Sequence, residues 1–137
     1  MAFPGGRRES QDSTLYETAV RETEEEVGLD LESSASFVAP LDDLISPLRE
    51  GRSSLVIRPQ VFVSCEPLRI TINDEVERCY WLPLAKLLDP ECRGVMPYRW
   101  KGNQVELPVI RIEDADIWGL SLRMLDSFFR VALESQP

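Results

Sequence analysis

The sequence predicts an α+β fold in which a mixed β-sheet of short strands lies between helices. Residues 14–27 begin with a capping-box pattern and end at Gly28, which suits a helix C-terminal cap. Residues 116–133 have a second helical, amphipathic pattern, and short apolar runs bounded by turn residues separate the two helices. At 137 residues the chain has the length of one domain, so we predict a single domain over residues 1–137.

The segments between the two helices predict strands and turns. Prolines interrupt residues 37–48, which indicates short extended segments, and residues 55–57 and 61–63 are strand-like on either side of Pro59. The other expected elements are weak strands at residues 69–72 and 76–82 around a turn at 73–75, a short helix ending at Leu88, and a hairpin turn at 101–103. The inner face of the last helix is expected to carry Ile117, Leu120, Met124, Leu125 and Phe128.

The composition excludes several classes of function. The chain has no histidine, which excludes Ser-His-Asp triads, histidine bases and histidine-ligated metal sites. It has 24 acidic against 15 basic residues, a net charge of −9, which argues against binding nucleic acid through its phosphates. Polar residues interrupt the longest apolar stretches, so we expect no membrane span, and with no targeting signal in view we expect an intracellular protein. Acids, bases and metal ligands must therefore be mostly carboxylates.

The three cysteines carry little functional signal. Cys65, Cys79 and Cys92 are odd in number and widely spaced, so neither a zinc site nor a disulfide framework is indicated. We expect buried or half-buried free thiols.

The most informative segment is the acidic end of the first predicted helix. Glu22, Glu25 and Glu26 stand at positions i, i+3 and i+4, so three carboxylates share one face. Two carboxylates about 5.5 Å apart repel by roughly 3 kcal/mol at an effective dielectric constant near 20. Arg21 can reach Glu25 at four-residue spacing but cannot neutralise three charges. A hard divalent cation, Mg²⁺ or Mn²⁺, is the natural remaining partner.

Two glycines upstream fit the same interpretation. Gly5 and Gly6 would let the backbone approach such a cation and offer it a carbonyl or an amide. The alternative is that the glutamates form an ordinary solvated helix face. The spacing of the whole segment favours the cation site.

Residues 6–29 resemble the signature of the Nudix hydrolase family, G-x5-E-x7-R-E-U-x-E-E-x-G-U, where U is a bulky apolar residue. Gly6 matches the first glycine. The second half matches without gaps at Arg21, Glu22, Glu25, Glu26, Gly28 and Leu29. Asp12 stands where the signature has Glu, eight residues instead of seven precede Arg21, and Thr23 takes the first apolar position.

More of the chain is similar to the coenzyme A pyrophosphatase branch of this family. Phe3-Pro4-Gly5-Gly6 and the extra residue before Arg21 resemble that branch. So do Asn73-Asp74-Glu75-Val76-Glu77 with Trp81-Leu82-Pro83-Leu84, Leu107-Pro108-Val109 and Ile117-Trp118-Gly119-Leu120-Ser121. The resemblance covers residue 3 to about residue 133. In that branch a Gly- and Arg-containing stretch and the first strands precede the F-P-G-G motif, so we expect this chain to lack those N-terminal strands.

The resemblance implies a Nudix fold and metal-dependent hydrolysis of a pyrophosphate bond in a small nucleotide substrate. The expected substrate is coenzyme A or an acyl-CoA, cleaved to adenosine 3′,5′-bisphosphate and 4′-phosphopantetheine. The resemblance also implies the roles of particular residues. Mg²⁺ or Mn²⁺ would be held by Glu22, Glu25 and Glu26 with Gly6, while Arg21 would hold the carboxylates in place.

The base that activates water would be Glu25 or Glu26, or else an acid from a distant loop, Glu75 or Glu77. Glu75 and Glu77 have an alternative interpretation as an exposed acidic turn. Asp12 would cap the helix or contact the metal ligands, with capping the favoured role. Two further sets of residues could have either a substrate role or a structural one. Phosphate contacts or solvated side chains are the alternatives for Arg7, Arg8 and Arg58. Stacking on an adenine or packing in the core are the alternatives for Tyr98, Trp100 and Trp118.

Two alternative functions remain open at the level of the sequence. The chain could be a truncated Nudix module that binds cations or a partner without catalysis, because missing strands would leave an open sheet edge. It could also hydrolyse another nucleoside diphosphate derivative. A homodimer in which a partner chain supplies flanking strands would favour an active enzyme.

Overall fold

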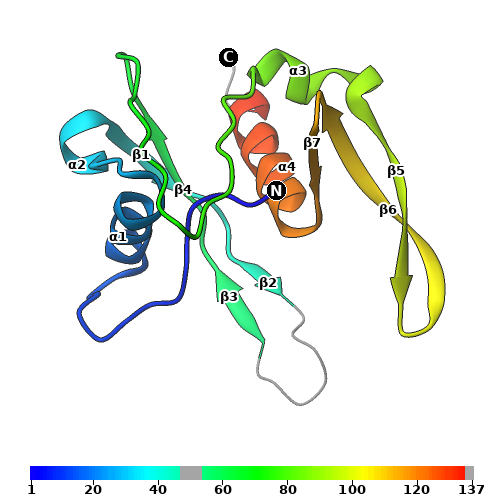
Figure 1. Cartoon of the computed structure of the whole chain (residues 1–137), viewed down its shortest axis with the longest axis horizontal. Helices are drawn as coiled ribbons and strands as arrows, with labels where there is room; N and C mark the ends of the chain where they lie inside the picture. The colour runs from blue at the N-terminus through cyan, green and yellow to red at the C-terminus, as the bar shows by residue number, and fades with distance from the viewer. Residues whose placement is uncertain (47–53, 135–137) are drawn as a thin grey trace. The chain divides into compact units, whose positions relative to one another are not determined.

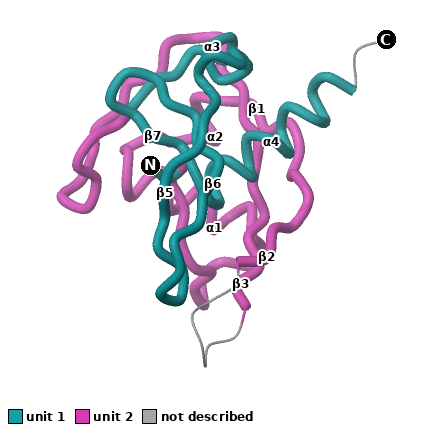
Figure 2. The backbone as a smooth tube through the Cα atoms, turned by 90° about the vertical axis from the view of Figure 1, so that its right-hand side faces the viewer, with its two compact units in different colours: residues 1–2, 80–137 teal, residues 3–79 magenta. Residues whose placement is uncertain are grey.

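We describe a computed structural model of the chain, which covers residues 1–46 and 54–134 (Figure 1). Its residues form two compact units, coloured separately in Figure 2. We call residues 3–79 the N-terminal unit, and residues 1–2 with 80–137 the C-terminal unit. Both contain helices and antiparallel strands, which confirms the α+β class. No helix in the described ranges has the length and apolar character needed to cross a membrane.

Helix α1 (Leu15–Val27) opens the N-terminal unit and confirms the first predicted helix. Thr14 is its N-cap, and the Thr14 hydroxyl accepts a hydrogen bond from the Glu17 backbone N–H at 3.2 Å. Gly28 ends the helix in the left-handed region at φ 66°, where it donates its N–H to the Glu24 carbonyl. Glycine suits this position because a side chain would strain that backbone conformation.

A long, interrupted hairpin follows the short helix α2 (Leu31–Ser34). Strand β1 (Ser36–Pro40) pairs with β4 (Gln60–Val63), and β2 (Leu44–Ser46) pairs with β3 (Leu55–Ile57), both antiparallel. These strands confirm the extended segments expected around Pro59; residues 47 and 48 of the expected segment lie outside the described residues.

Aromatic packing attaches α1 to this hairpin. The Tyr16 ring lies 5.0 Å from that of Phe37 on β1 and 5.8 Å from that of Phe62 on β4, measured between centroids. The buried apolar residues of the N-terminal unit cluster just after the helix, at Val27, Leu29 and Leu31. The acidic face of α1 is therefore anchored at both ends of the helix.

The C-terminal unit is an antiparallel meander covered by a helix. Its strands are β5 (Arg93–Trp100), β6 (Asn103–Ile112) and β7 (Ala115–Trp118), in that order in the sheet. The expected hairpin turn joins β5 to β6, with Lys101 and Gly102 both at positive φ. Helix α3 (Leu84–Leu88) ends where predicted, and a 3₁₀ turn (Pro90–Cys92) leads into the sheet.

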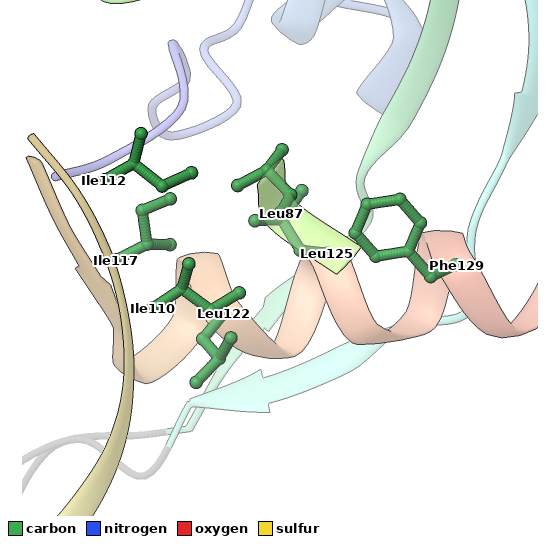
Figure 3. Packing of buried hydrophobic residues seen from close by; sticks show 7 residues of the cluster. All are labelled: Leu87, Ile110, Ile112, Ile117, Leu122, Leu125 and Phe129. Carbon is green, nitrogen blue, oxygen red and sulfur yellow. The ribbon is translucent and has the colours of Figure 1, made fainter. Parts of the chain in front are cut away.

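Helix α4 (Gly119–Glu134) packs its apolar face on β6 and β7. The cluster, drawn in Figure 3, consists of Leu87, Ile110, Ile112, Ile117, Leu122, Leu125 and Phe129. Of the expected inner-face residues of this helix, Leu125 is buried and Phe128 packs at the edge of the cluster. Leu122 and Phe129 are buried in addition.

Several predicted elements are wrong. Residues 69–72 and 76–82 form no strand, because the backbone of the first of these segments bonds to the end of α1 instead of to a neighbouring strand. The last helix begins at Gly119, not at residue 116, because residues 115–118 pair with β6 as a strand. In place of the expected mixed sheet, all pairings among the described strands are antiparallel, since hairpins or short turns join the paired strands.

The cysteines are free thiols, as expected, but Cys65 and Cys79 are exposed instead of buried. Cys92 is half-buried at the edge of the C-terminal core. Residues 65 and 79 lie in segments without regular structure, so no apolar layer covers their side chains.

Replacing Leu122 by Ala should lower the free energy of unfolding by about 2–5 kcal/mol, because Leu122 is 3% exposed within the α4 cluster. Leu133→Ala is the matched control on the same helix, since Leu133 is 54% exposed, and it should change the free energy by no more than about 0.5 kcal/mol. Urea denaturation followed by circular dichroism measures both. Equal losses for the two variants would contradict this packing.

Candidate active site on helix α1

Arg21 is the central cation of the acidic face. Its guanidinium bonds to Asp12 through Nε at 3.0 Å and Nη2 at 2.9 Å. Nη1 lies 3.0 Å from a carboxylate oxygen of Glu22 and 3.0 Å from one of Glu25. Nη2 also donates to the Arg7 carbonyl at 3.2 Å. One guanidinium therefore ties the residue 7–12 loop to two of the three helix glutamates, and the expected contact with Glu25 is present.

Asp12 is the anchor of this arrangement. It is 4% exposed, and besides Arg21 it accepts hydrogen bonds from the Glu9 backbone N–H at 2.9 Å and the Thr18 hydroxyl at 3.0 Å. The Arg21 hydrogen bonds, followed by that from Glu9, hold the pKa of the Asp12 carboxyl well below its usual range. The favoured capping role for Asp12 is wrong: Thr14 caps α1, because Thr14 directly precedes the first helical residue whereas Asp12 lies two residues further upstream.

Gly6 lies directly against the Glu22 carboxyl group. A Cβ atom at position 6 would overlap that carboxyl, so any other residue here would displace the Glu22 side chain. The backbone of Gly6 is not in the left-handed region, so close approach, not backbone conformation, accounts for glycine here. The loop thus leaves space for the Glu22 carboxylate, whose side chain is only 15% exposed.

Glu26 is the most electrostatically perturbed glutamate of the helix. Burial raises the pKa of the Glu26 carboxyl, while a hydrogen bond from the Gly5 backbone N–H opposes this shift. The charges of Glu22, Glu75 and Glu25 raise the pKa further, and the net shift is upward. Two helix carboxylates and one from a distant loop are therefore close enough to Glu26 to raise its pKa.

The loop at residues 71–75 reaches this cluster by docking on the end of α1. The Thr71 N–H donates to the Val27 carbonyl at 2.9 Å, and the Asn73 N–H donates to the Glu26 carbonyl at 3.1 Å. The Asn73 side-chain Nδ2 donates to the Glu25 carbonyl at 2.9 Å. The predicted turn at 73–75 is present, and it brings Glu75 to the helix end.

Glu77 differs from Glu75. Both residues are exposed, but Glu77 is not among the charges that act on Glu26. Of the two loop acids that the sequence proposes, the structure brings only Glu75 to the helix glutamates.

Two of the three candidate phosphate-binding arginines are engaged elsewhere. Arg8 donates to the carbonyls of Asp12 and Ser13 at 2.9 and 3.1 Å, which stabilises the loop. Arg58 forms a bidentate ion pair with Asp43 at 2.6 and 2.8 Å, and this contact holds the pKa of Asp43 below its usual range. Arg7 contributes its backbone carbonyl to Arg21, and its side chain is exposed.

The candidate aromatic residues belong to the C-terminal unit. Tyr98 and Trp118 pack on each other with ring centroids 5.5 Å apart, across the β5–β6–β7 sheet. Trp100 is 47% exposed at the end of β5. For Tyr98 and Trp118, sheet packing accounts for the positions of the rings.

A protein-family comparison decides the family. The model of the NUDIX domain matches residues 1–98, a span that includes the whole acidic helix and the docked loop. The chain belongs to the Nudix family. The glutamates and glycines described above lie within the matched span.

Several curated proteins are similar to this Nudix chain. The "Uncharacterized Nudix hydrolase NudL" of Yersinia enterocolitica is 40% identical over 91% of this chain and 62% of its own length. The "Mitochondrial coenzyme A diphosphatase NUDT8" of Homo sapiens is 29% identical over 88% of this chain and 50% of its own. A Schizosaccharomyces pombe protein is 40% identical over 68% of this chain and 29% of its own. The chain spans about a third to two-thirds of the length of these relatives.

Nudix hydrolases generally use divalent metal ions, and the side chains of this site fit one chemically. Glu22, Glu25 and Glu26 supply carboxylate oxygens, the ligands that Mg²⁺ and Mn²⁺ prefer, and Gly6 leaves room for the Glu22 carboxylate. As placed, no group of three such side chains in the described ranges forms a ready metal site. Arg21 holds two of the three carboxylates, so these would have to turn from Arg21 to share a cation.

Sequence reasoning missed Asn73 and the docking of its loop. The sequence held part of the information, because the side chain of an Asn at the start of a turn commonly accepts a hydrogen bond from the backbone N–H two residues later. The Glu75 N–H indeed donates to Asn73 Oδ1 at 2.9 Å. Its second contact, to a carbonyl 48 residues away, has no local signature.

Replacing Asp12 by Asn should lower the stability of the protein in a pH-dependent way. The folded-state pKa of Asp12 is depressed, so its contribution is present above the unfolded pKa of about 3.9 and is lost as the pH falls through the folded value. The difference in free energy of unfolding between wild type and Asp12→Asn should therefore be constant from pH 5 to 7 and shrink below about pH 4. Urea titrations across this range measure it, and a difference that grew at low pH would contradict the Asp12–Arg21 pairing.

Proposed function

We propose that this chain carries the active site of a metal-dependent hydrolase that cleaves the pyrophosphate bond of a nucleoside diphosphate derivative. The observation that carries the proposal is the gathering of Glu22, Glu25, Glu26 and Glu75 at one helix end. Four carboxylates at one place repel each other, and a hard cation offsets that repulsion while leaving positions for phosphate oxygens. Membership of the Nudix family supports this activity.

The glutamates of α1 would hold Mg²⁺ or Mn²⁺ beside Gly5, whose missing side chain leaves open space, and Gly6, which contacts the Glu22 carboxyl. When bound, such a cation polarises phosphoryl oxygens and lowers the pKa of water. In this structure Arg21 holds Glu22 and Glu25 beside each other through Nη1, and these carboxylates would turn from Arg21 to the cation when it binds. The position of Arg21 is fixed by the paired bonds to Asp12.

A carboxylate must take the proton of the attacking water as the new P–O bond forms and the anhydride P–O bond breaks. Glu26 and Glu75 are the two candidates that we favour, because both lie at the helix end and the charge of Glu75 contributes to the raised pKa of Glu26. For contact with the substrate phosphates we propose Arg7. This residue directly follows Gly6, and it is exposed.

For the substrate we propose coenzyme A or an acyl-CoA. The support is the similarity to proteins named mitochondrial coenzyme A diphosphatase, from Homo sapiens and from Mus musculus, each aligned over 88% of this chain. The F-P-G-G motif and the one-residue-longer spacing before Arg21 support the same branch.

Incubation with coenzyme A and Mg²⁺ or Mn²⁺ should release adenosine 3′,5′-bisphosphate and 4′-phosphopantetheine in equal amounts. Separation of the products by chromatography measures the reaction, and chelation with EDTA should stop it, because the helix carboxylates act through the cation. Cleavage of other nucleoside diphosphate derivatives but not of coenzyme A would overturn the substrate and leave the family activity in place.

Replacing both Glu25 and Glu26 by Gln should lower kcat by roughly 10²–10⁴-fold, because the site loses two cation ligands and a candidate base. The stability of the protein should change little, since Glu25 has 57% of its side chain exposed and Glu26 lies at the helix surface. Glu24→Gln is the matched control: Glu24 is exposed on the same helix, outside the cluster, and should keep wild-type activity.

A non-catalytic binding module is the second candidate function. The observation that favours it is the engagement of Glu22 and Glu25 by Arg21, which leaves no ready metal site among the described side chains. Calorimetric titration with Mn²⁺ separates the two. Binding without turnover of any nucleoside diphosphate derivative would favour the module, whereas turnover that requires the cation would exclude it.

A further inference from the structure

The carbonyl groups at the end of α1 are satisfied by a distant loop. The last four carbonyls of a helix have no partner within the helix. Here the Glu24 carbonyl receives the Gly28 N–H, whereas those of Glu25, Glu26 and Val27 receive donors from residues 71–73. The loop therefore acts as a C-terminal cap for the helix that carries the acidic cluster.

Asn73 is central to this contact, because its side-chain amide both donates and accepts a hydrogen bond. Nδ2 donates to the Glu25 carbonyl at 2.9 Å, and Oδ1 accepts the Glu75 N–H at 2.9 Å. Its backbone N–H donates to the Glu26 carbonyl at 3.1 Å, and its carbonyl accepts the Val76 N–H at 3.3 Å. One residue thus joins the backbone beneath Glu25 and Glu26 to the backbone beneath Glu75.

The close approach of the loop also depends on Gly28. A Cβ atom at position 28 would lie 3.0 Å from the Thr71 carbonyl oxygen and 3.1 Å from the Thr71 Cβ. A side chain there would press against the loop as well as strain the left-handed backbone. Gly28 therefore both ends the helix and allows the loop to dock against it.

We propose that Asn73 is a positioning residue that holds the Glu75 carboxylate at the Glu25–Glu26 end of the helix, where it completes the acidic cluster. The proposal rests on the function proposed above and extends it to a residue outside the signature helix. Like charges at short range repel, so Glu75 would turn away if its backbone were not fixed. The four hydrogen bonds of Asn73 supply that constraint.

Asparagine suits this position better than aspartate. Aspartate could still accept the Glu75 N–H, but it has no donor for the Glu25 carbonyl. Its charge would also face the negative end of the helix dipole and the glutamates. Asn73→Asp should therefore be no better than Asn73→Ala, although it is the closer isostere.

The first test compares Asn73→Ala with the matched control Asn103→Ala, at an exposed residue of the β5–β6 turn. Asn73→Ala should lower kcat by roughly tenfold to a hundredfold with KM changed by less than about threefold, because a displaced carboxylate affects chemistry more than substrate binding. The Glu75 amide should exchange its hydrogen faster in this variant, as measured by NMR. Unchanged kcat, or an unchanged exchange rate at Glu75, would overturn the proposal.

A double-mutant cycle tests whether Asn73 acts through Glu75. Glu75→Gln alone should lower kcat, and the Asn73→Ala/Glu75→Gln double variant should be no more than about twofold slower than Glu75→Gln. Independent, multiplicative losses would mean that Asn73 acts by another route. A Glu75→Gln variant with wild-type kcat would likewise overturn the proposal.

The same cycle on Mn²⁺ binding separates this proposal from the proposed function. If wild type hydrolyses no nucleoside diphosphate derivative, the proposed function fails, but Mn²⁺ dissociation constants from electron paramagnetic resonance remain measurable. Asn73→Ala and Glu75→Gln should each weaken Mn²⁺ binding, and the double variant should bind no more weakly than Glu75→Gln. Additive losses, or no loss with Asn73→Ala, would overturn the positioning role.

Discussion

The paired hydrogen bonds between Arg21 and Asp12 are the contact on which the acidic face depends. Asp12 is buried, and it fixes the guanidinium with two bonds at 2.9 and 3.0 Å. The opposite edge of that guanidinium then meets the carboxylates of Glu22 and Glu25. A buried carboxylate is stable only when its hydrogen-bonding capacity is satisfied, and Thr18 and Glu9 complete it here. The loop before α1 is thereby held against the helix.

Repulsion between carboxylates explains much of the remaining arrangement of the acidic cluster. Partial burial and the charges of three other glutamates raise the pKa of Glu26, so positive charge beside this carboxylate is favoured. Arg21 supplies one cation, and the absence of a side chain at Gly6 leaves room for the Glu22 carboxylate. The same arrangement that would destabilise an isolated helix would therefore suit the divalent ion that we propose for this site.

The end of α1 shows how structural and functional requirements coincide. Gly28 ends the helix, and its lack of a side chain admits Thr71 to close contact. The exposed carbonyls of the last turn need donors, and Asn73 provides two of them while it holds the Glu75 backbone. A strand at residues 69–72, which the sequence predicted, could have used the Thr71 N–H within a sheet and left the Val27 carbonyl without that donor.

Local sequence determined the parts of this protein that depend on neighbouring residues. The caps of α1 at Thr14 and Gly28 and the shared face of Glu22, Glu25 and Glu26 follow from contacts within one or two helical turns. Tertiary structure decided the remainder. The burial of Asp12, the strand instead of helix at residues 115–118, and the link from Asn73 to Glu25 each depend on partners that a local pattern does not encode. For residues 115–118 and for Asn73 those partners are backbone groups, which every residue carries alike, so only the folded chain selects among them. For Asp12 the chief partner is the side chain of Arg21, which the loop before the helix must fold back to meet.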